Sequence, residues 1–506
     1  MREDWIEAAL GEVFETVTGN TPSKKDKDNY GSEIPFIKPP QINNNFLKTS
    51  AEFLSTKGKI KARILPLNSV LVTCIGNLGR IGINKAEVAF NQQINAIKPI
   101  SGIEPKYTFY QAQSVSFRNQ LEKLSTSTTV ALVNKTSFNS VKFKIAPLPI
   151  QKAIVNKIEE LFSSLDSGIA DLKKAQDQLV IYRQAVLKKA FEGELTKEWR
   201  EKQTNLPSNN ELLELIKEER QKHYNQQLAD WKEAVKVWEK NGKDGKKPVK
   251  PRFSAFNQIE HSTPSLKIPD SWVVVTPNNI ADPQNYSVGI GPFGSNLKVS
   301  DYTGDGHPII FVRHITKRDF SLNRKFTSNE KFHELRAHTV FPLDLLITKM
   351  GDPPGDCLIY PKNEIPGVIT SDIIKFKVWD RFVSRKYIMY AVNSIQTKTQ
   401  LGLITQGVAQ KKISLGRFKT LKFPFTSVEE QHQIVQEIES RLSVCDTVEK
   451  DIADSLEKAQ ALRQSILKKA FEGTLLSEEE IAECKAHPDY VPASVLLARI
   501  KKKKNG

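Results

Sequence analysis

The sequence predicts an α+β fold, in which two globular domains of mixed helix and strand are separated by two long helices that pair as an antiparallel coiled coil. Three observations support this fold. A chain of 506 residues is too long for one ordinary hydrophobic core. A segment of 43 residues recurs later in the chain, and apolar residues in both copies follow a seven-residue period. The chain is therefore expected to be a pseudo-twofold internal repeat.

The repeat is the strongest of these observations. Residues 151–193 align with residues 431–473 at a constant offset of 280, and 17 of the 43 aligned positions are identical. Both copies end with the letters LKKAFEG. Identity of this extent at one fixed offset indicates a duplicated structural element.

Each copy has the pattern of a long helix with an apolar seam. In the first copy the two interleaved series are Ile158, Leu165, Leu172, Leu179 and Val186, and Ile154, Leu161, Gly168, Ala175 and Tyr182. The second copy keeps a weaker seam at Ile438, Cys445, Ile452, Ala459 and Ile466. A helix of 43 residues is about 65 Å long and cannot bury such a seam alone. A pseudo-twofold arrangement of the halves would make the two helices antiparallel.

Both ends of these helices carry recognisable signals. Pro147 and Pro149 precede the first helix, and Ser427 with Glu430 has the spacing of a capping box at the second. In LKKAFEG, two lysines fall in the last turn, and the glycine suits the left-handed position that follows a helix. A helix stop explains the lysines and the glycine. The recurrence of Ala-Phe-Glu is better explained by an equivalent partner contact at both sites.

The remaining chain divides around the two helices. The predicted order is a first variable domain, a first long helix, a linker with a charged helix, a second variable domain, a second long helix and a helical tail, at residues 1–146, 147–195, 196–266, 267–425, 426–475 and 476–506. Fainter echoes link the two halves, at 34–42 with 307–315, 70–76 with 345–351, and 212–217 with 496–501. The two halves are expected to share a backbone fold but to differ in the residues that this fold presents on its surface.

Positive charge is concentrated in the two variable domains. Residues 1–145 hold 19 Lys and Arg against 12 Asp and Glu, a net charge of +7, and residues 265–425 hold 22 against 13, or +9. The rest of the chain has 33 residues of each sign and is neutral. An anionic ligand should therefore meet the variable domains, while the helices suit spacing and protein contacts.

Several classes of protein are not indicated. No apolar run approaches the roughly 18–20 residues that a membrane span requires, and the acidic start MREDWIEAALGEVFE does not fit a signal peptide. Four separated cysteines without a CxxC pair indicate neither a disulfide framework nor a zinc site. The expected location is the cytoplasm.

Motifs of catalysis are also missing or incomplete. GIGPFG at residues 289–294 matches GxGxxG, but Pro292 interrupts it outside any βαβ pattern. DPPG at residues 352–355 has glycine where an amino-methyltransferase motif has an aromatic residue. No phosphate loop or HExxH cluster is present. We expect no catalytic residue and no metal site in this chain.

The combination of these features resembles one known family. The duplicated helices ending LKKAFEG, their opening sequences LPIQKAIVNKIEEL and TSVEEQHQIVQEI, and the dissimilar domain before each resemble the specificity (S) subunit of type I restriction-modification systems. GELTKEWRE after the first helix and IPDSW before the second domain are also similar to that family. The similarity covers nearly the whole chain.

The resemblance implies a non-catalytic DNA-binding subunit. Its two target recognition domains would each read one half of an interrupted DNA sequence, with the coiled coil as spacer. It would assemble with two modification (methyltransferase) subunits, which use S-adenosylmethionine, and with restriction subunits, which use ATP and Mg²⁺; no cofactor is implied in this chain. The candidate partner-binding residues are Lys188, Lys189, Phe191, Lys468, Lys469 and Phe471. Core packing would explain the two phenylalanines equally well.

Candidate DNA-binding residues follow from side-chain chemistry, because base edges are read mainly by Arg, Lys, Asn and Gln. In the first domain they are Lys38, Gln41, Asn43, Arg80, Gln92 and the polar run 125–129. In the second they are Arg313, His314, Lys317, Arg318, Lys349, Gln406, Gln410, Lys411 and Lys412. Asn91 and Gln92 could instead be buried structural amides. The alternative function is a non-catalytic coiled-coil scaffold that binds nucleic acid without sequence specificity.

Overall fold

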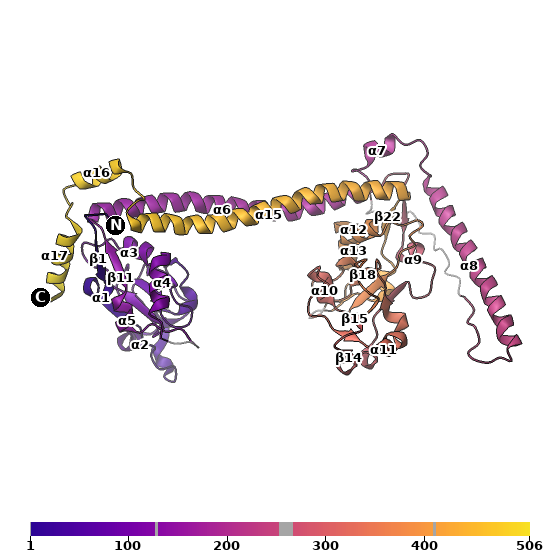
Figure 1. Ribbon diagram of the computed structural model, residues 1–506, viewed down its shortest axis with the longest axis horizontal. Helices are drawn as coiled ribbons and strands as arrows, with labels where there is room; N and C mark the ends of the chain where they lie inside the picture. The colour runs from indigo at the N-terminus through magenta and orange to yellow at the C-terminus, as the bar shows by residue number, and fades with distance from the viewer. Residues whose placement is uncertain (1, 127–129, 252–266, 408–410, 506) are drawn as a thin grey trace. The chain divides into compact units, whose positions relative to one another are not determined.

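The computed structural model describes residues 2–126, 130–251, 267–407 and 411–505, which form two compact units (Figure 1). The first unit contains residues 1–175 and 451–506, and the second contains residues 176–450. Two long helices, α6 (Leu148–Phe191) and α15 (Val428–Glu472), contribute to both units. The predicted α+β class with two long helices is confirmed.

The long helices pair in the antiparallel sense in each unit. In the first unit the early part of α6 lies beside the late part of α15, where Arg463 contacts Asp166. In the second unit the late part of α6 lies beside the early part of α15, where Arg183 is 2.7 Å from Asp446. Both pairs join repeat-equivalent positions, 280 residues apart. One interhelix contact is therefore made twice.

The sequence LKKAFEG ends both helices in the same way. Gly193 and Gly473 have φ values of +74° and +83°, in the left-handed region that glycine reaches without steric cost. The next amide in each copy, that of Glu194 or Thr474, donates to the carbonyl of Lys189 or Lys469 at 2.9 Å. This 6→1 bond is the mark of a Schellman motif. The predicted helix stop is confirmed.

The first domain is built on two sheets. One has the strand order β2-β10-β7-β8-β4, with bounds Thr16–Thr18, Ile94–Ile97, Val70–Thr73, Ile81–Asn84 and Asn45–Leu47. The other has the order β5-β3-β9-β6, with bounds Phe53–Leu54, Tyr30–Ile37, Val88–Phe90 and Ile64–Leu65. A short pair joins β1 (Ile6–Ala9) to β11 (Lys142–Ile145). The helices are α1 (Leu10–Val13), α2 (Thr56–Lys61), α3 (Pro105–Ala112), α4 (Val115–Lys123) and α5 (Lys135–Ser140).

The second domain repeats this plan. One sheet has the order β13-β21-β18-β19, with bounds Val288–Ile290, Ile373–Phe376, Leu345–Thr348 and Cys357–Ile359. The other has the order β14-β16-β15-β20-β17, with bounds Tyr302–Thr303, Phe326–Thr327, His307–Ile310, Gly367–Ile369 and Thr339–Val340. The short pair is β12 (Val273–Val275) with β22 (Phe423–Phe425). The helices are α9 (Pro277–Ile280), α10 (Val312–Thr316), α11 (Asn329–Glu334), α12 (Arg385–Asn393), α13 (Ile395–Ile404) and α14 (Leu415–Phe418).

Strand pairing confirms the faint sequence echoes. β3 pairs in parallel with β9, and β15 pairs in parallel with β20. β7 lies between β10 and β8, just as β18 lies between β21 and β19. All four residues of β7 and of β18 are buried, which explains why their sequences VLVT and LLIT each begin with three apolar residues in a row instead of alternating with polar ones. The segments 34–42 and 70–76 therefore have true counterparts at 307–315 and 345–351.

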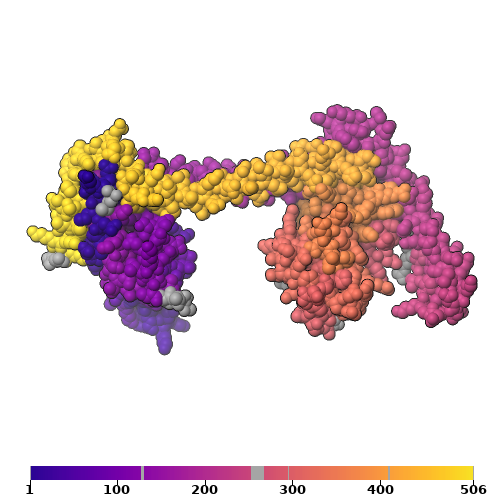
Figure 2. Space-filling view, viewed as in Figure 1, coloured from indigo at the N-terminus to yellow at the C-terminus, as the bar shows by residue number. Residues whose placement is uncertain are grey.

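A helical segment follows each long helix and packs against one domain. In the second unit these are α7 (Lys197–Glu201) and α8 (Asn209–Lys240), and in the first unit α16 (Glu478–Ala486) and α17 (Ala493–Asn505). Figure 2 shows the yellow C-terminal helices beside the indigo N-terminal segment, where Tyr490 donates to Asp4 at 3.0 Å. Arg220 of α8 donates to the Ala281 carbonyl at 2.6 Å, and Lys504 of α17 donates to the Phe14 carbonyl at 2.9 Å. The two segments thus make corresponding contacts. Within the described residues, no helix is long and apolar enough to cross a membrane.

Candidate nucleic-acid interface

Four loops of the first domain meet at one edge of its sheets. Because β3 and β9 are parallel neighbours, the loops after them, 38–44 and 91–93, begin at the same edge, and the Asn91 amide donates to the Ile37 carbonyl at 3.1 Å. The loop 74–80 after β7 joins them through the Cys74 amide, which donates to the Gln93 carbonyl at 2.8 Å. The Val133 amide donates to the Cys74 carbonyl at 2.9 Å and brings in the loop before α5. We call these four loops the first edge.

The second domain builds its edge with corresponding bonds. The Thr370 amide donates to the Ile310 carbonyl at 3.1 Å, and the Lys349 amide donates to the Asp372 carbonyl at 2.7 Å. The Ile413 amide donates to the Lys349 carbonyl at 3.0 Å. These bonds join the loops 311–323, 349–356, 370–372 and the described parts of 404–413, which we call the second edge. All of the DNA-binding candidates lie on the first or second edge, except Gln410 and residues 127–129, which lie outside the described residues.

Asn43 and Arg80 come together on the first edge. Both line a hollow of about 480 Å³. Within the described residues, no hydrogen bond or ion pair engages the Arg80 side chain, and Asn43 is exposed. Asn77 and Arg118 line the same hollow and were not among the candidates. The signal that could have found Asn77 is its position in the Gly-flanked turn that follows the buried strand β7.

The other candidates of the first edge are partly engaged within the domain. Lys38 forms an ion pair with Glu52. Gln41 accepts from the Lys38 amide at 2.8 Å and donates to the Ser50 hydroxyl at 2.7 Å, so it holds its own loop. Gln92 is exposed, whereas Asn91 is buried. The alternative of a structural amide therefore fits Asn91 and Gln41 better than Gln92.

Arg313 lines a hollow on the second edge. Its guanidinium lies 4.0 Å from the centre of the Phe311 ring and donates to the Asn323 carbonyl at 2.9 Å. The hollow has a volume of about 390 Å³, and Tyr302 and Ser371 also line it. Neither of these two residues was a sequence candidate. A stacked, oriented guanidinium at the mouth of a polar hollow has the chemistry that guanine recognition uses.

His314 has a different place from the one its sequence suggested. It is buried, with 1 % of its surface exposed. Its Nδ1 accepts from the Phe311 amide at 3.3 Å, and its Nε2 lies 2.8 Å from the Leu322 carbonyl. Burial lowers the pKa of His314 and favours the neutral ring. Because a base edge cannot reach this ring, His314 positions the loop rather than facing outward.

The remaining candidates of the second edge are spread over three loops. Lys317 and Arg318 are exposed after α10. Lys349 is half-buried and donates to the Ser371 carbonyl at 3.1 Å. Lys411 pairs with Asp352 at 2.7 Å, and Gln406 and Lys412 are joined through their backbones and exposed. Lys317, Arg318 and Lys412 are therefore the most accessible cations of this edge.

The two phenylalanines of the repeated helix ends pack inside their domains. Phe471 and Phe191 are 5 % and 1 % exposed. Their ring centres lie 5.3 and 5.2 Å from those of Tyr107 and Tyr387, both in edge-to-face geometry. This contact accounts for the recurrence of phenylalanine without a partner. A partner contact of Lys188, Lys189, Lys468 and Lys469, which are all exposed, stays a prediction.

No group of three or more His, Cys, Asp or Glu residues in the described part of the chain is arranged to hold a metal ion. The edges instead combine cations, amides and hydroxyls on exposed loops, at the ends of buried strands. This arrangement can position hydrogen-bond donors and acceptors against a polyanion.

Comparison with known proteins agrees with this interpretation. Residues 2–174 match the family model described as "Type I restriction modification DNA specificity domain". The specificity subunit of the type I restriction enzyme EcoKI from Escherichia coli K12 is 24 % identical over 530 aligned residues, covering 99 % of this chain and 95 % of that protein. The StySPI specificity subunit from Salmonella potsdam is 24 % identical over 517 residues, with the same coverage.

A solved structure shares the fold. It comes from work on complex assembly and conformational transition of the type I R-M system, and it superposes with a TM-score of 0.63. The sequence identity is 16 %, and the match covers 94 % of this chain and 99 % of the other. The likeness therefore extends over both units.

Proposed function

We propose, from the premise that this chain belongs with the specificity subunits of type I restriction-modification systems, that it reads an interrupted, two-part DNA sequence and directs companion subunits to it. Each of its two edges reads one half of the target. The subunit is not an enzyme, and the chemistry on DNA belongs to its companions.

One observation carries this proposal. The two domains repeat the same edge, with corresponding backbone bonds, but present different side chains on it, such as Asn43 with Arg80 on one and Arg313 with Lys317 on the other. A shared scaffold with different contact residues is what two different half-sites require. The net charges of +7 and +9 on the two domains supply the attraction for the phosphate backbone.

The subunit associates with methyltransferase and restriction subunits. We infer that two modification subunits bind, because the exposed lysine pair of LKKAFEG occurs twice, once in each unit. We further infer that S-adenosylmethionine is bound by the modification subunits and ATP with Mg²⁺ by the restriction subunits, with no cofactor in this chain. The coiled coil would then set the spacing between the half-sites.

The test is to co-express the chain with its modification subunit and to map methylated bases across the host genome by single-molecule sequencing. The expected result is one interrupted, asymmetric motif that disappears when the chain is omitted. Exchanging residues 267–425 for the matching domain of a relative should change one half of the motif and leave the other half intact.

Methylation that does not depend on the chain, with a modification subunit shown to be active, would contradict the proposal. Methylation that depends on the chain but falls on sites with no common sequence would favour the alternative of a scaffold that binds nucleic acid of any sequence.

A further inference from the structure

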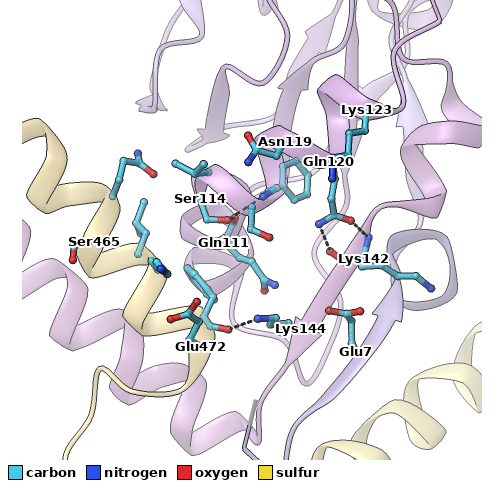
Figure 3. A pocket seen from close by; sticks show the side chains of 17 residues that line it. Glu7, Gln111, Ser114, Asn119, Gln120, Lys123, Lys142, Lys144, Ser465 and Glu472 are labelled. Atoms are coloured by element: carbon cyan, nitrogen blue, oxygen red, sulfur yellow. Dashed lines mark hydrogen bonds between the residues drawn. The ribbon is translucent and has the colours of Figure 1, made fainter.

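A groove in the first unit lies beside the end of the repeated helix. It has a volume of about 640 Å³ and is walled by α4, by β11 and by the last turns of α15 (Figure 3). Phe117, Leu467 and Phe471 line it and are buried, while Val115 is 50 % exposed. The groove therefore offers apolar surface next to the LKKAFEG sequence.

The polar rim of the groove is mainly basic. Four lysines line it against two glutamates: Lys123, Lys142, Lys144 and Lys468 against Glu7 and Glu472. The walls are fixed by hydrogen bonds. Lys144 Nζ donates to the Phe471 carbonyl at 2.9 Å, and the Gln120 side chain accepts from the Lys142 amide at 2.7 Å and donates to the Lys142 carbonyl at 3.2 Å (Figure 3). A basic rim over an apolar floor favours an occupant with both acidic and apolar side chains.

In the second unit, a side chain fills the place that corresponds to this groove. Gln396 stands at the position of Ser116, 280 residues later, and its Nε2 donates to the Lys188 carbonyl at 3.0 Å. This bond spans from α13 to α6 where the first unit has an exposed serine. Leu403 and Pro424 also replace Lys123 and Lys144. The corresponding place in the second unit is therefore occupied by a side chain, and it is less basic than the groove of the first unit.

We propose that the groove of the first unit binds a segment of the modification subunit that carries acidic and apolar side chains, and that the corresponding place in the second unit binds such a segment less tightly. This inference rests on the proposed function, because it names the docking surface of a companion subunit. A protein segment is favoured over DNA as the occupant because the polyanionic backbone of DNA gains nothing from contact with an apolar floor. Lys468, one of the recurring lysines, lies on the rim of the groove and links it to the repeated helix end.

The test uses the full-length chain with its modification subunit and needs no DNA. Titration followed by native mass spectrometry gives the affinities for binding the first and the second modification subunit. Ser116→Gln copies the side chain that closes the second unit and should weaken the tighter binding step roughly tenfold, a loss of about 1.4 kcal/mol. Ser116→Ala, which leaves the groove open, is the matched control and should leave this step unchanged.

The reciprocal variant is Gln396→Ser, which shortens the side chain, removes its amide and should tighten the weaker step. It keeps the test decisive if Ser116→Gln disturbs folding. The double variant Lys123→Glu with Lys468→Glu should weaken the tighter step, whereas Lys503→Glu, an exposed charge on α17, should not. Hydrogen exchange of the complex should show protection of residues 115–123 on binding of the modification subunit.

The proposal that this groove binds the modification subunit would be overturned if all these variants bind it with unchanged affinities and residues 115–123 gain no protection. The proposed function would still stand. A wild-type chain that binds no modification subunit at all would instead contradict the proposed function. Protection of 115–123 by DNA alone would also overturn the inference.

Discussion

The two units share one backbone plan, but they bury different chemistry. Where the first unit has Ile150, Ala96 and Ser69, the second has the charged residues Glu430, Lys375 and Asp344 at corresponding positions. Each of these six residues is buried. The apolar seam and the Phe–Tyr contact are common to both units, so the shared geometry does not depend on the buried charges.

The contrast is sharpest where each domain meets its long helix. Glu430 accepts from Trp272 Nε1 at 2.9 Å, from the Thr426 hydroxyl at 2.6 Å and from the Thr196 hydroxyl at 2.8 Å, and it pairs with Arg200. In the first unit, Ile150 takes the place of Glu430, and the Nε1 of Trp5 has no hydrogen-bond partner within the described residues. The difference shows that the contact between a domain and its long helix can be built around an apolar residue or around an ion pair. It also predicts that the second unit is more sensitive to the loss of one partner.

The largest expected effect follows from removing the shared carboxylate. Glu430→Ala leaves Arg200 and Trp272 without their partner, and breaking a buried ion pair costs about 3–5 kcal/mol. Ile150→Val at the corresponding position should cost only about 0.5–1.5 kcal/mol. Hydrogen exchange under native conditions, followed in peptides from each unit, measures both effects. Equal destabilisation of the two units would break the comparison.

A second effect concerns the buried lysine of β21. Burial lowers the pKa of Lys375 to about 8, although its Nζ donates to the Thr339 carbonyl at 2.6 Å. Between pH 8 and about 10.5 the unfolded chain binds more protons at this residue than the folded chain, so stability gained at Lys375 rises with pH, by at most about 1.4 kcal/mol per pH unit.

Lys375→Met should therefore stabilise the second unit at pH 7, and its advantage over wild type should shrink as the pH rises from 8 to 10. Burial raises the pKa of Cys357 in the same unit and lowers stability at high pH, but this effect is common to both proteins and cancels in their difference. Denaturant unfolding at several pH values is the measurement. A constant difference between the two proteins across this range would contradict the assignment.

Local patterns predicted the helices, but they did not predict how distant residues meet. The heptads and the glycine of LKKAFEG depend on neighbours in sequence, and both helix ends were found. Glu430 was interpreted as part of a capping box. Its amide does donate to the Ser427 hydroxyl at 3.3 Å, but its carboxylate binds Trp272 and Arg200, which are far away in sequence. Partners of this kind leave no local signal.

The same reason limits prediction of the candidate interface. All of the described candidates lie on the two edges, because polar loops after buried strands are visible in sequence. His314 was misjudged as exposed because a helix of only five residues, such as α10, is too short for its sequence pattern to reveal which side faces inward. The contact between the rings of Tyr107 and Phe471 was not predicted. Tyr387 lies 280 residues after Tyr107, at the offset of the repeat, but identical residues are too sparse in this part of the two domains to reveal the match.

The smallest expected effect tests whether the repeated interhelix contact is equivalent in the two units. Arg183→Ala removes the ion pairs with Asp446 and Glu449, and Arg463→Ala removes the pair with Asp166. Because the acidic partners are exposed, each ion pair lost should cost about 0.2–1 kcal/mol. Because the pairs are solvent-accessible, both losses should become smaller at high salt. Unfolding measured at low and at high salt checks this. A large loss in only one unit would show that the two contacts are not equivalent.

The most direct test of the central claim changes one edge and reads both halves of the DNA target. In the assembled complex with the modification subunit, Arg80→Ala should relax selectivity in one half of the motif, and Arg313→Ala should relax it in the other half. Each loss should be about 1–3 kcal/mol, the size expected for an arginine that contacts a base. Binding selection from a randomised DNA pool, at one fixed salt concentration, gives both halves in one experiment. Relaxation confined to a different half for each variant is the predicted result. Equal loss of affinity for every sequence, with selectivity unchanged in both halves, would contradict the account.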